Sequence, residues 1–217
     1  MKFQSTLLSC HWFSQDLYTL QLSKPAGFTF LPGQFISISY GNIEREYTLI
    51  TCPDDPDLRV LIKQVPQGQL SNTLAKLPLG TTLFLSPARG YFCYHLSENR
   101  PCFIATGTGI APFIAMAASG VRHFTLLHGV RHISALVCKE ELTSAAKLYV
   151  PCLSADCAGM ETLPNLHRGH VSSYVRNNLS AGTYDFYLCG LRAMIYDLTH
   201  QLDAQFPGSR VYSEAYD

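Results

Sequence analysis

The stretch CFIATGTGIAPFIAMAA, residues 102–118, carries no charge and is interrupted at its centre by Gly107, Gly109 and Pro112. The apolar run before Gly107 is short enough for a buried strand, and the run after Gly109 reads as a helix that tolerates Pro112 in its first turn. The glycines let the backbone approach a phosphate group, toward which the free N–H groups of a helix start would point. The stretch therefore predicts a strand, a glycine turn and a helix, the order typical of nucleotide-binding sites.

Two other interpretations compete with a nucleotide site. The uncharged segment 101–121 is long enough to suggest a membrane-spanning helix, but the central glycines and proline interrupt it, so we expect no membrane insertion. The motif also departs from GxGxxG, since Pro112 takes the place of the third glycine, and no Gly-Lys-Ser/Thr follows as in a P-loop. Taken alone, it fits an ordinary strand-to-helix turn equally well.

Composition narrows the class of protein. The 217 residues include 16 basic and 16 acidic side chains, so no net charge favours nucleic acid or an anionic membrane as a partner. The eight cysteines include no CxxC pair, which argues against a disulfide framework, and the N-terminus lacks the pattern of a signal peptide. We therefore expect a reduced, cytoplasmic protein with no nucleic-acid partner, and the oligomeric state stays open.

A metal site is not expected. Cys152 and Cys157 have the C-x4-C spacing of plant-type 2Fe–2S ferredoxins, but Met160 stands where the third thiolate would be. Such a cluster needs four ligands, so this pair is incomplete. The eight histidines show no HExxH motif or other ligand spacing.

The pattern of apolar and turn residues changes along the chain, which predicts two domains. Up to about residue 95, short alternating or apolar runs separated by turn residues indicate an antiparallel β-barrel or sandwich. From Arg100 onward, strand-like runs alternate with helical ones, which predicts a doubly wound α/β domain with a parallel sheet. We place the boundary near the sequence HLSENRP, with the β-barrel domain at residues 1–97 and the α/β domain at residues 98–217.

Five short motifs carry a resemblance to a known family. They are REYT (45–48), GQLS (68–71), GTGIAP (107–112), YLCG (187–190) and SEAY (213–216). With these motifs in this order, the chain resembles the ferredoxin-NADP reductase family over nearly its whole length. The resemblance implies a flavin-binding barrel followed by a nicotinamide-nucleotide domain, with FAD and NADH or NADPH as cofactors.

In the barrel, the resemblance implies that Arg45 pairs with the flavin pyrophosphate, Tyr47 lies against the isoalloxazine ring and Thr48 hydrogen-bonds near its reactive N5. A guanidinium group suits phosphate oxygens, and an aromatic ring gives a flat cofactor a stacking surface. Gly68 and Ser71 would form the turn that receives the pyrophosphate, with Ser71 capping the following helix or touching a phosphate oxygen. The neighbours that complete the predicted flavin-binding set are Glu46, Ile62, Lys63, Gln69 and Leu70.

In the α/β domain, the resemblance implies a nicotinamide-nucleotide site with reactive groups at one end. Cys189 would lie beside the nicotinamide carbon that gives up hydride, Glu214 would relay a proton or orient the nicotinamide, and Tyr216 would shield the second flavin face. These three residues and Thr48 form the predicted catalytic set. The nucleotide-binding residues taken from the same motifs are Thr106, Gly107, Thr108, Gly109, Pro112, Cys189, Gly190 and Tyr216.

The chain departs from the family pattern at two points. Ser86 stands where a Gly-Pro pair is usual, which affects the shape of that loop more than its chemistry. Asp217 follows Tyr216, so an extra negative charge lies next to the ring expected to shield the flavin.

The choice between NADH and NADPH depends on which side chains contact the 2'-position of the adenosine ribose. Members that bind NADPH tend to carry Ser-Arg after the relevant strand, whereas this chain has Ser154 and, two residues later, Asp156. A carboxylate accepts hydrogen bonds from a 2'-hydroxyl and repels a 2'-phosphate, so Asp156 favours NADH. Arg131 argues for NADPH, because bacterial NADPH-binding members also carry arginine there, and Arg168 or Arg192 could serve the same phosphate. We predict NADH and leave NADPH open.

We predict an NAD(P)H-dependent flavin oxidoreductase, in which hydride passes from NAD(P)H to bound FAD and the electrons pass to a separate carrier. No ferredoxin-like domain is fused in this sequence, so the resemblance implies ferredoxin, flavodoxin or an oxygenase component as the partner. Two alternatives stay open: a free-flavin reductase, and a non-catalytic, redox-sensing flavoprotein subunit.

Overall fold

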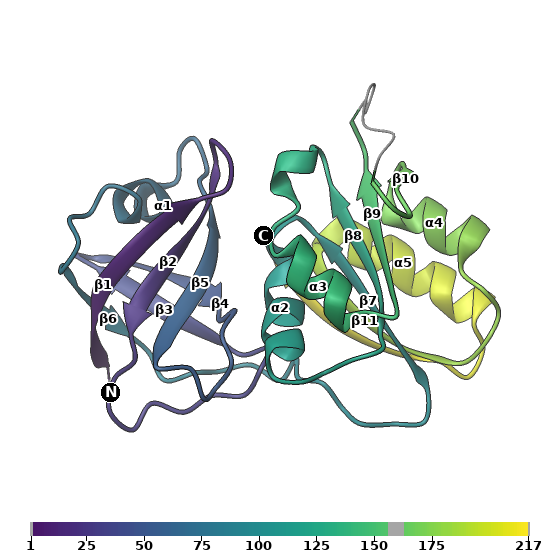
Figure 1. Ribbon diagram of the computed structural model, residues 1–217, viewed down its shortest axis with the longest axis horizontal. Helices are drawn as coiled ribbons and strands as arrows, with labels where there is room; N and C mark the ends of the chain where they lie inside the picture. Colours follow the sequence, from purple (N-terminus) through teal and green to yellow (C-terminus); the bar gives the residue numbers. More distant parts are fainter. Residues whose placement is uncertain (1, 156–162, 217) are drawn as a thin grey trace. The chain divides into compact units, whose positions relative to one another are not determined.

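The computed structural model describes residues 2–155 and 163–216 (Figure 1). The chain falls into two compact units. The first comprises Met1–Tyr94 and Ala111–Ser119, and the second comprises His95–Ile110 and Gly120–Asp217. The predicted division between residues 97 and 98 stays a prediction, and Ala111–Ser119, which it assigns to the second domain, groups with the first unit.

The first unit is built on an antiparallel sheet. Its elements are β1 (Phe3–Trp12), β2 (Leu17–Ser23), β3 (Phe35–Tyr40), β4 (Ile43–Thr48), β5 (Asp57–Lys63), the short helix α1 (Gln69–Leu74) and β6 (Thr82–Leu85). The strand order is β4-β3-β6-β1-β2-β5, and every pairing is antiparallel. The two end strands also meet, because Leu49 bridges to Val60 and the Ile50 N–H donates to the Arg59 carbonyl at 2.9 Å. The sheet thereby closes into a barrel.

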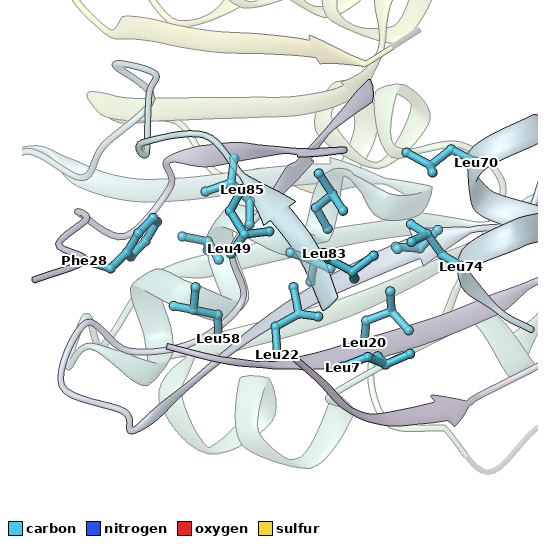
Figure 2. Packing of buried hydrophobic residues seen from close by; sticks show 14 of the residues in the cluster. Leu7, Leu20, Leu22, Phe28, Leu49, Leu58, Leu70, Leu74, Leu83 and Leu85 are labelled. Atoms are coloured by element: carbon cyan, nitrogen blue, oxygen red, sulfur yellow. The ribbon is translucent and has the colours of Figure 1, made fainter. Parts of the chain in front are cut away.

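Leucines at alternating strand positions fill the core of this barrel. Leu20 and Leu22 alternate along β2, and both are fully buried. Figure 2 shows their side chains beside those of Leu7 and Leu83, and Leu74 of α1 belongs to the same cluster. Burying one leucine side chain contributes about 1.5–3 kcal/mol. This core therefore anchors β4 and α1, the two elements that carry most of the predicted flavin residues.

The second unit contains a parallel sheet of six strands. The elements from residue 100 onward are β7 (Arg100–Thr106), η1 (Gly107–Ile110), α2 (Ala111–Ala118), β8 (Thr125–Val130), η2 (Ile133–Ala135), α3 (Lys139–Ala145), β9 (Leu148–Leu153), β10 (His167–Arg168), α4 (Val171–Asn178), β11 (Tyr184–Leu191), α5 (Arg192–Gln205) and β12 (Arg210–Tyr216). Of these, α2 groups with the first unit. The strand order is β10-β9-β8-β7-β11-β12.

This strand order makes the second unit a doubly wound sheet. The chain runs from β7 outward to β10 and then returns to the other side of β7 with β11 and β12. Val175 of α4 and Leu198 of α5 pack on one face of the sheet against Ile104, Leu127 and Leu188. Together, the antiparallel and parallel sheets confirm the predicted fold class.

The uncharged stretch is divided among three elements. Residues 102–118 form most of β7, all of η1 and α2, so strand and helix are separated by the glycine turn. None of the described helices is long and apolar enough to cross a membrane, and α5, the longest of them, has 14 residues.

Candidate functional site

The order of the parallel sheet reverses between β7 and β11, and ligands of doubly wound folds bind at such a reversal. β7 ends at Thr106 and continues directly into η1, a 3-10 turn made of Gly107–Ile110. β11 passes through Cys189 and Gly190 and ends at Leu191. The predicted nucleotide residues Thr106–Gly109, Cys189 and Gly190 therefore lie at the carboxyl ends of these two strands.

Two glycines allow these strand ends to come close together. A Cβ atom on Gly109 would lie 2.2 Å from the Cys189 carbonyl oxygen, which leaves no room for a larger residue. A Cβ atom on Gly190, whose φ is +132°, would lie 2.2 Å from Thr106 Oγ1. Gly107 differs, since its φ is +55° and a Cβ there would meet nothing within 4 Å. Gly109 and Gly190 thus permit the close packing, whereas Gly107 leaves its backbone open to a ligand.

Cys189 and Glu214 are neighbours at the carboxyl end of the sheet. The register of β11 with β12 pairs Cys189 with Glu214, and the register of β11 with β7 pairs it with Ala105. The thiol is fully buried. Burial and, as a smaller cause, the Glu214 carboxylate raise the pKa of Cys189, while a hydrogen bond with the Tyr216 side chain acts in the opposite direction. Cys189, Glu214 and Tyr216, all predicted to be catalytic, therefore lie together.

On the flavin side, Arg45 and Tyr47 lie on the same face of β4, because they are two positions apart on a strand. The Arg45 side chain is exposed, and no carboxylate of the described residues forms an ion pair with it. The Tyr47 ring packs half-buried against the barrel core, and burial raises its pKa to about 12 against the opposing charge of Arg45. Thr48, at the end of the strand, is buried.

Glu46 points to the opposite face of β4 from Arg45 and Tyr47. Its carboxylate lies 3.2 Å from Arg89 Nη2, and the same nitrogen donates to Ser37 Oγ at 2.6 Å. The side chain of Glu46 is thus engaged in an ion pair on the outer face of the strand. A partner from the segment that follows β6 could not be anticipated from the motif REYT.

The turn before α1 is tight. Gly68 is the N-cap of α1, and a Cβ there would lie 2.6 Å from Ser71 Oγ. Ser71 lies within the first helical turn, where its hydroxyl accepts a hydrogen bond from the Val65 N–H at 3.4 Å. Of the two roles predicted for Ser71, capping the helix is wrong, because the helix begins before it. The hydroxyl accepts this bond and keeps its own hydrogen for another acceptor, such as a phosphate oxygen.

Three other predicted flavin residues have side chains with partners in the first unit, two in its core and one on its surface. Ile62 and Leu70 are buried in its core. Lys63 Nζ lies 3.7 Å from Asp16 Oδ2. A contact of Ile62 or Leu70 with flavin would therefore have to come from the backbone, whereas Gln69 is exposed at the first position of α1.

The residues predicted to meet the adenosine ribose come from the ends of three neighbouring strands. Arg131 follows β8, Ser154 follows β9, and Arg168 ends β10. The Ser154 N–H donates to the Val130 carbonyl at 3.1 Å, which extends the parallel pairing beyond the strands. Asp156, on which the prediction of NADH rests, lies outside the described residues. The described part of the chain thus places one arginine at the end of each strand that neighbours β9.

Within residues 2–155 and 163–216, no group of three or more His, Cys, Asp or Glu side chains could hold a metal ion. Cys157 and Met160, which belong to the C-x4-C segment considered above, lie outside these ranges.

Comparisons with known proteins match both halves of the chain. Residues 6–94 match the oxidoreductase FAD-binding domain, and residues 103–200 match the oxidoreductase NAD-binding domain. A flavodoxin/ferredoxin-NADP reductase of Shigella flexneri is 30% identical over 209 residues, which cover 85% of this chain and 83% of that protein. The chain belongs to the ferredoxin-NADP reductase family. This confirms the family predicted from the five motifs and the two classes of cofactor, FAD and a nicotinamide nucleotide.

The comparisons also found a second relative and a solved structure with the same fold. The toluate 1,2-dioxygenase electron transfer component of Pseudomonas putida is 26% identical over 214 residues, covering 94% of this chain. The chain spans only 64% of the length of that relative. A ferredoxin NADP+ reductase from Neisseria gonorrhoeae, solved with bound FAD and NADP, superimposes with a TM-score of 0.87 at 20% identity, covering 99% of this chain and 98% of that one. At this identity, the superposition shows the shared fold.

The residues of this ferredoxin-NADP reductase family chain fit both cofactors. Because the backbone at Gly107 is open, a phosphate could reach the N–H groups after β7. On β4, the exposed guanidinium of Arg45 and the adjacent ring of Tyr47 offer a cation and a stacking surface. The roles of the individual residues toward the cofactors stay predictions.

Gly129 and His128 also lie near the carboxyl ends of the strands, although no sequence motif assigned them to the site. Gly129 pairs with Thr106 in the register of β8 and β7, and a Cβ there would lie 3.2 Å from Thr106 Cγ2. His128 is fully buried, and its Nδ1 lies 3.0 Å from the Tyr149 hydroxyl oxygen. Gly129 could have been found, since an isolated glycine in a strand often marks a close approach of another segment.

Proposed function

We propose that this chain is an NAD(P)H-dependent flavin oxidoreductase that passes electrons to a separate carrier protein. One observation supports the proposal most: Cys189, Glu214 and Tyr216 gather at the carboxyl ends of β11 and β12, next to the reversal of strand order. A buried thiol beside a carboxylate and a phenol offers a polar, water-poor surface to the nicotinamide end of a dinucleotide.

The flavin side of the site would be organised by three residues of β4. When bound, FAD would accept a hydride from the nicotinamide and could release the electrons singly or in pairs. Arg45 would pair with the pyrophosphate, Tyr47 would support the ring by stacking, and the buried Thr48 hydroxyl would hydrogen-bond near the reacting nitrogen. Contacts of this kind hold reacting atoms at about 3–3.5 Å, the separation that hydride transfer needs.

The nucleotide side would rely on backbone groups. Residues 102–118 include no lysine or arginine, so anion binding would come from the N–H groups of Gly107–Ile110 and from the Thr108 hydroxyl. Cys189 would lie against the nicotinamide ring, and Glu214 would hold or move a proton at its edge. Pro112, in the first turn of α2, would keep the helix start in place.

We propose NADH as the preferred donor, on the basis of Asp156. Arg131 and Arg168 support the competing choice, because a cation at the end of β8 or β10 would attract a 2'-phosphate. The experiment described below therefore compares NADH with NADPH.

The electron acceptor in this proposal is ferredoxin, flavodoxin or an oxygenase component. The relatives named above include a flavodoxin/ferredoxin-NADP reductase and the electron transfer component of a dioxygenase. A cytoplasmic location is part of the proposal, since the described cysteines form no disulfide with one another.

The test is the visible spectrum of the purified protein, followed by anaerobic addition of NADH and of NADPH. We expect flavin absorption that bleaches on addition of a nucleotide, faster with NADH, and electron transfer to an added ferredoxin or flavodoxin. A protein without flavin absorption after incubation with FAD, or one that does not bleach, contradicts the proposal. Flavin that leaves on gel filtration and is then reduced as a free substrate would identify a free-flavin reductase, and nucleotide binding without bleaching would identify a redox-sensing subunit.

A further inference from the structure

We propose that Thr106 is a positioning residue that fixes the Cys189–Gly190 turn, and through it the Cys189 thiol. The resemblance assigns Thr106 to the nucleotide contacts, but its side chain is directed toward the neighbouring strands of its own sheet. The catalytic consequence of this role rests on the proposed function. The structural consequence does not, and it can be measured separately.

The Thr106 side chain lies in a slot between two glycines on neighbouring strands. On the β8 side, a Cβ on Gly129 would lie 3.2 Å from Thr106 Cγ2. On the β11 side, a Cβ on Gly190 would lie 2.2 Å from Thr106 Oγ1. The methyl group therefore faces β8 and the hydroxyl group faces β11. Because a β-branched side chain has few χ1 rotamers, this slot holds the hydroxyl in one direction.

The hydroxyl ties together the two strand ends at the reversal of strand order. The Leu191 N–H donates to Thr106 Oγ1 at 3.0 Å. The register of β7 with β11 ends at the pair Ala105 and Cys189, so this side-chain bond continues the pairing beyond the last backbone pair. This hydrogen bond therefore crosses the reversal of strand order between β7 and β11, where doubly wound folds bind their ligands.

The same turn is held from a second direction by Gly109. A Cβ on Gly109 would lie 2.2 Å from the Cys189 oxygen and 2.6 Å from the Gly190 nitrogen. The backbone of Gly109 therefore packs directly against the peptide group between Cys189 and Gly190. Thr106 and Gly109 belong to one continuous segment, the end of β7 and η1. The loop proposed to bind the pyrophosphate, Gly107–Ile110, therefore packs directly against the Cys189–Gly190 turn that carries the thiol. The Thr106 hydroxyl adds a hydrogen bond between the same two segments.

Two substitutions separate the hydroxyl from the shape of the side chain. Thr106→Val keeps the shape and removes the hydrogen bond, and Thr106→Ser keeps the hydroxyl. We expect Thr106→Val to slow flavin bleaching by NADH about tenfold, the scale of one lost hydrogen bond at a positioned group. The Kd for ADP-ribose, which lacks the nicotinamide, should stay within about twofold, and Thr106→Ser should recover most of the bleaching rate.

A second readout does not depend on bound cofactor. Cys189 is fully buried, so its alkylation by iodoacetamide, followed peptide by peptide in the mass spectrometer, reports how firmly the turn is held. Thr106→Val should speed this alkylation about fivefold or more, and Thr106→Ser should not. Thr143→Val is the matched control, because it removes a hydroxyl that donates to the Lys139 carbonyl on α3 at 2.6 Å. If Thr106→Val does not fold, Thr106→Ala, which also lacks the hydroxyl, replaces it.

Three results would overturn the assignment. Unchanged bleaching and alkylation in Thr106→Val would show that the hydrogen bond holds nothing in place. Weaker binding of ADP-ribose in step with slower bleaching would make Thr106 a direct nucleotide ligand. Equal losses in the serine and valine variants would mean that the methyl group, not the hydroxyl, matters. A wild-type chain that never bleaches contradicts the proposed function alone, since the alkylation rates still decide the role of Thr106.

Discussion

Cys189 and Glu214 lie directly opposite each other on β11 and β12. The carboxylate adds to the effect of burial and raises the pKa of the thiol further. Since only a thiolate is a strong nucleophile, a thiol kept protonated in this way is suited to contact a ligand ring rather than to attack it. Glu214 therefore acts on Cys189 in addition to any contact of its own with a nucleotide.

Glu214→Gln should both slow flavin bleaching and shift the ionisation of Cys189. Removing a negative charge favours the thiolate, so the pH profile of Cys189 alkylation should move to lower pH. The bleaching rate should fall by about a hundredfold, the lower end of the range for a lost proton-transfer group. Asp203→Asn removes an exposed carboxylate from α5 and should change neither property. An unchanged bleaching rate would take Glu214 out of the catalytic set.

Arg45→Gln should weaken FAD binding. The exposed guanidinium would lose its charge-assisted bonds to the pyrophosphate, which are worth about 1.5–3 kcal/mol, so Kd should rise at least about tenfold. Quenching of flavin fluorescence during titration of the apoprotein measures this constant. Arg59→Gln on β5, whose guanidinium lies 4.0 Å from Asp55, is the control and should leave Kd unchanged. Equal affinities of the Arg45 variant and the wild type would remove the pyrophosphate role.

The strand, turn and helix of residues 102–118 could be predicted because their signals are local. Gly107 and Gly109 have to permit a turn or a close approach, and Pro112 has to lie in a first helical turn, whatever the rest of the chain does. The pairing of Cys189 with Glu214 is different. Register between separate strands depends on packing across the whole sheet, so only the family motifs, and no local pattern, suggested that these residues meet.

The flavin residues show the same limit of local patterns. The motif GQLS contains a glycine and a serine that can each start a helix, and the structure uses Gly68, so Ser71 falls inside the first turn. In REYT, strand alternation places Arg45 and Tyr47 on one face, where they pair with Ile38 and Ile36 of β3. It gives no information about Arg89, which is far away in sequence and pairs with Glu46 on the other face.

Gly109→Ala should disrupt the nucleotide side of the site. The added methyl group would lie 2.2 Å from the Cys189 oxygen, and backbone atoms cannot yield as a flexible side chain can. We expect a loss of about 1–3 kcal/mol in the free energy of unfolding, together with loss of ADP-ribose binding. Gly41→Ala is the control, because its φ of +59° costs about 1–2 kcal/mol, yet its Cβ meets nothing within 4 Å. It should bind ADP-ribose normally, and normal binding by the Gly109 variant would contradict the close approach.

His128 should make the second unit sensitive to acid. Burial lowers its pKa to about 3 in the folded protein, so the imidazole stays neutral while the unfolded chain takes up a proton below about pH 6.5. Stability is thus fully present above that pH and falls by about 1.4 kcal/mol per pH unit as the pH drops toward the folded pKa. In His128→Leu, the dependence of the unfolding free energy on pH between 6 and 4.5 should be shallower by this slope. Parallel curves for the two proteins would show that His128 titrates normally.

Arg131→Gln should change the choice between nucleotides rather than the reaction itself. If the guanidinium at the end of β8 meets a 2'-phosphate, kcat/KM for NADPH should fall about tenfold or more, while that for NADH stays within about twofold. Arg122→Gln is the control, since Arg122 precedes β8 and so lies at the other end of that strand. Equal losses with both donors would mean that Arg131 contacts the pyrophosphate, which the two nucleotides share. No loss with either donor would remove Arg131 from the nucleotide site and leave Arg168 as the cation nearest in the sheet to Ser154.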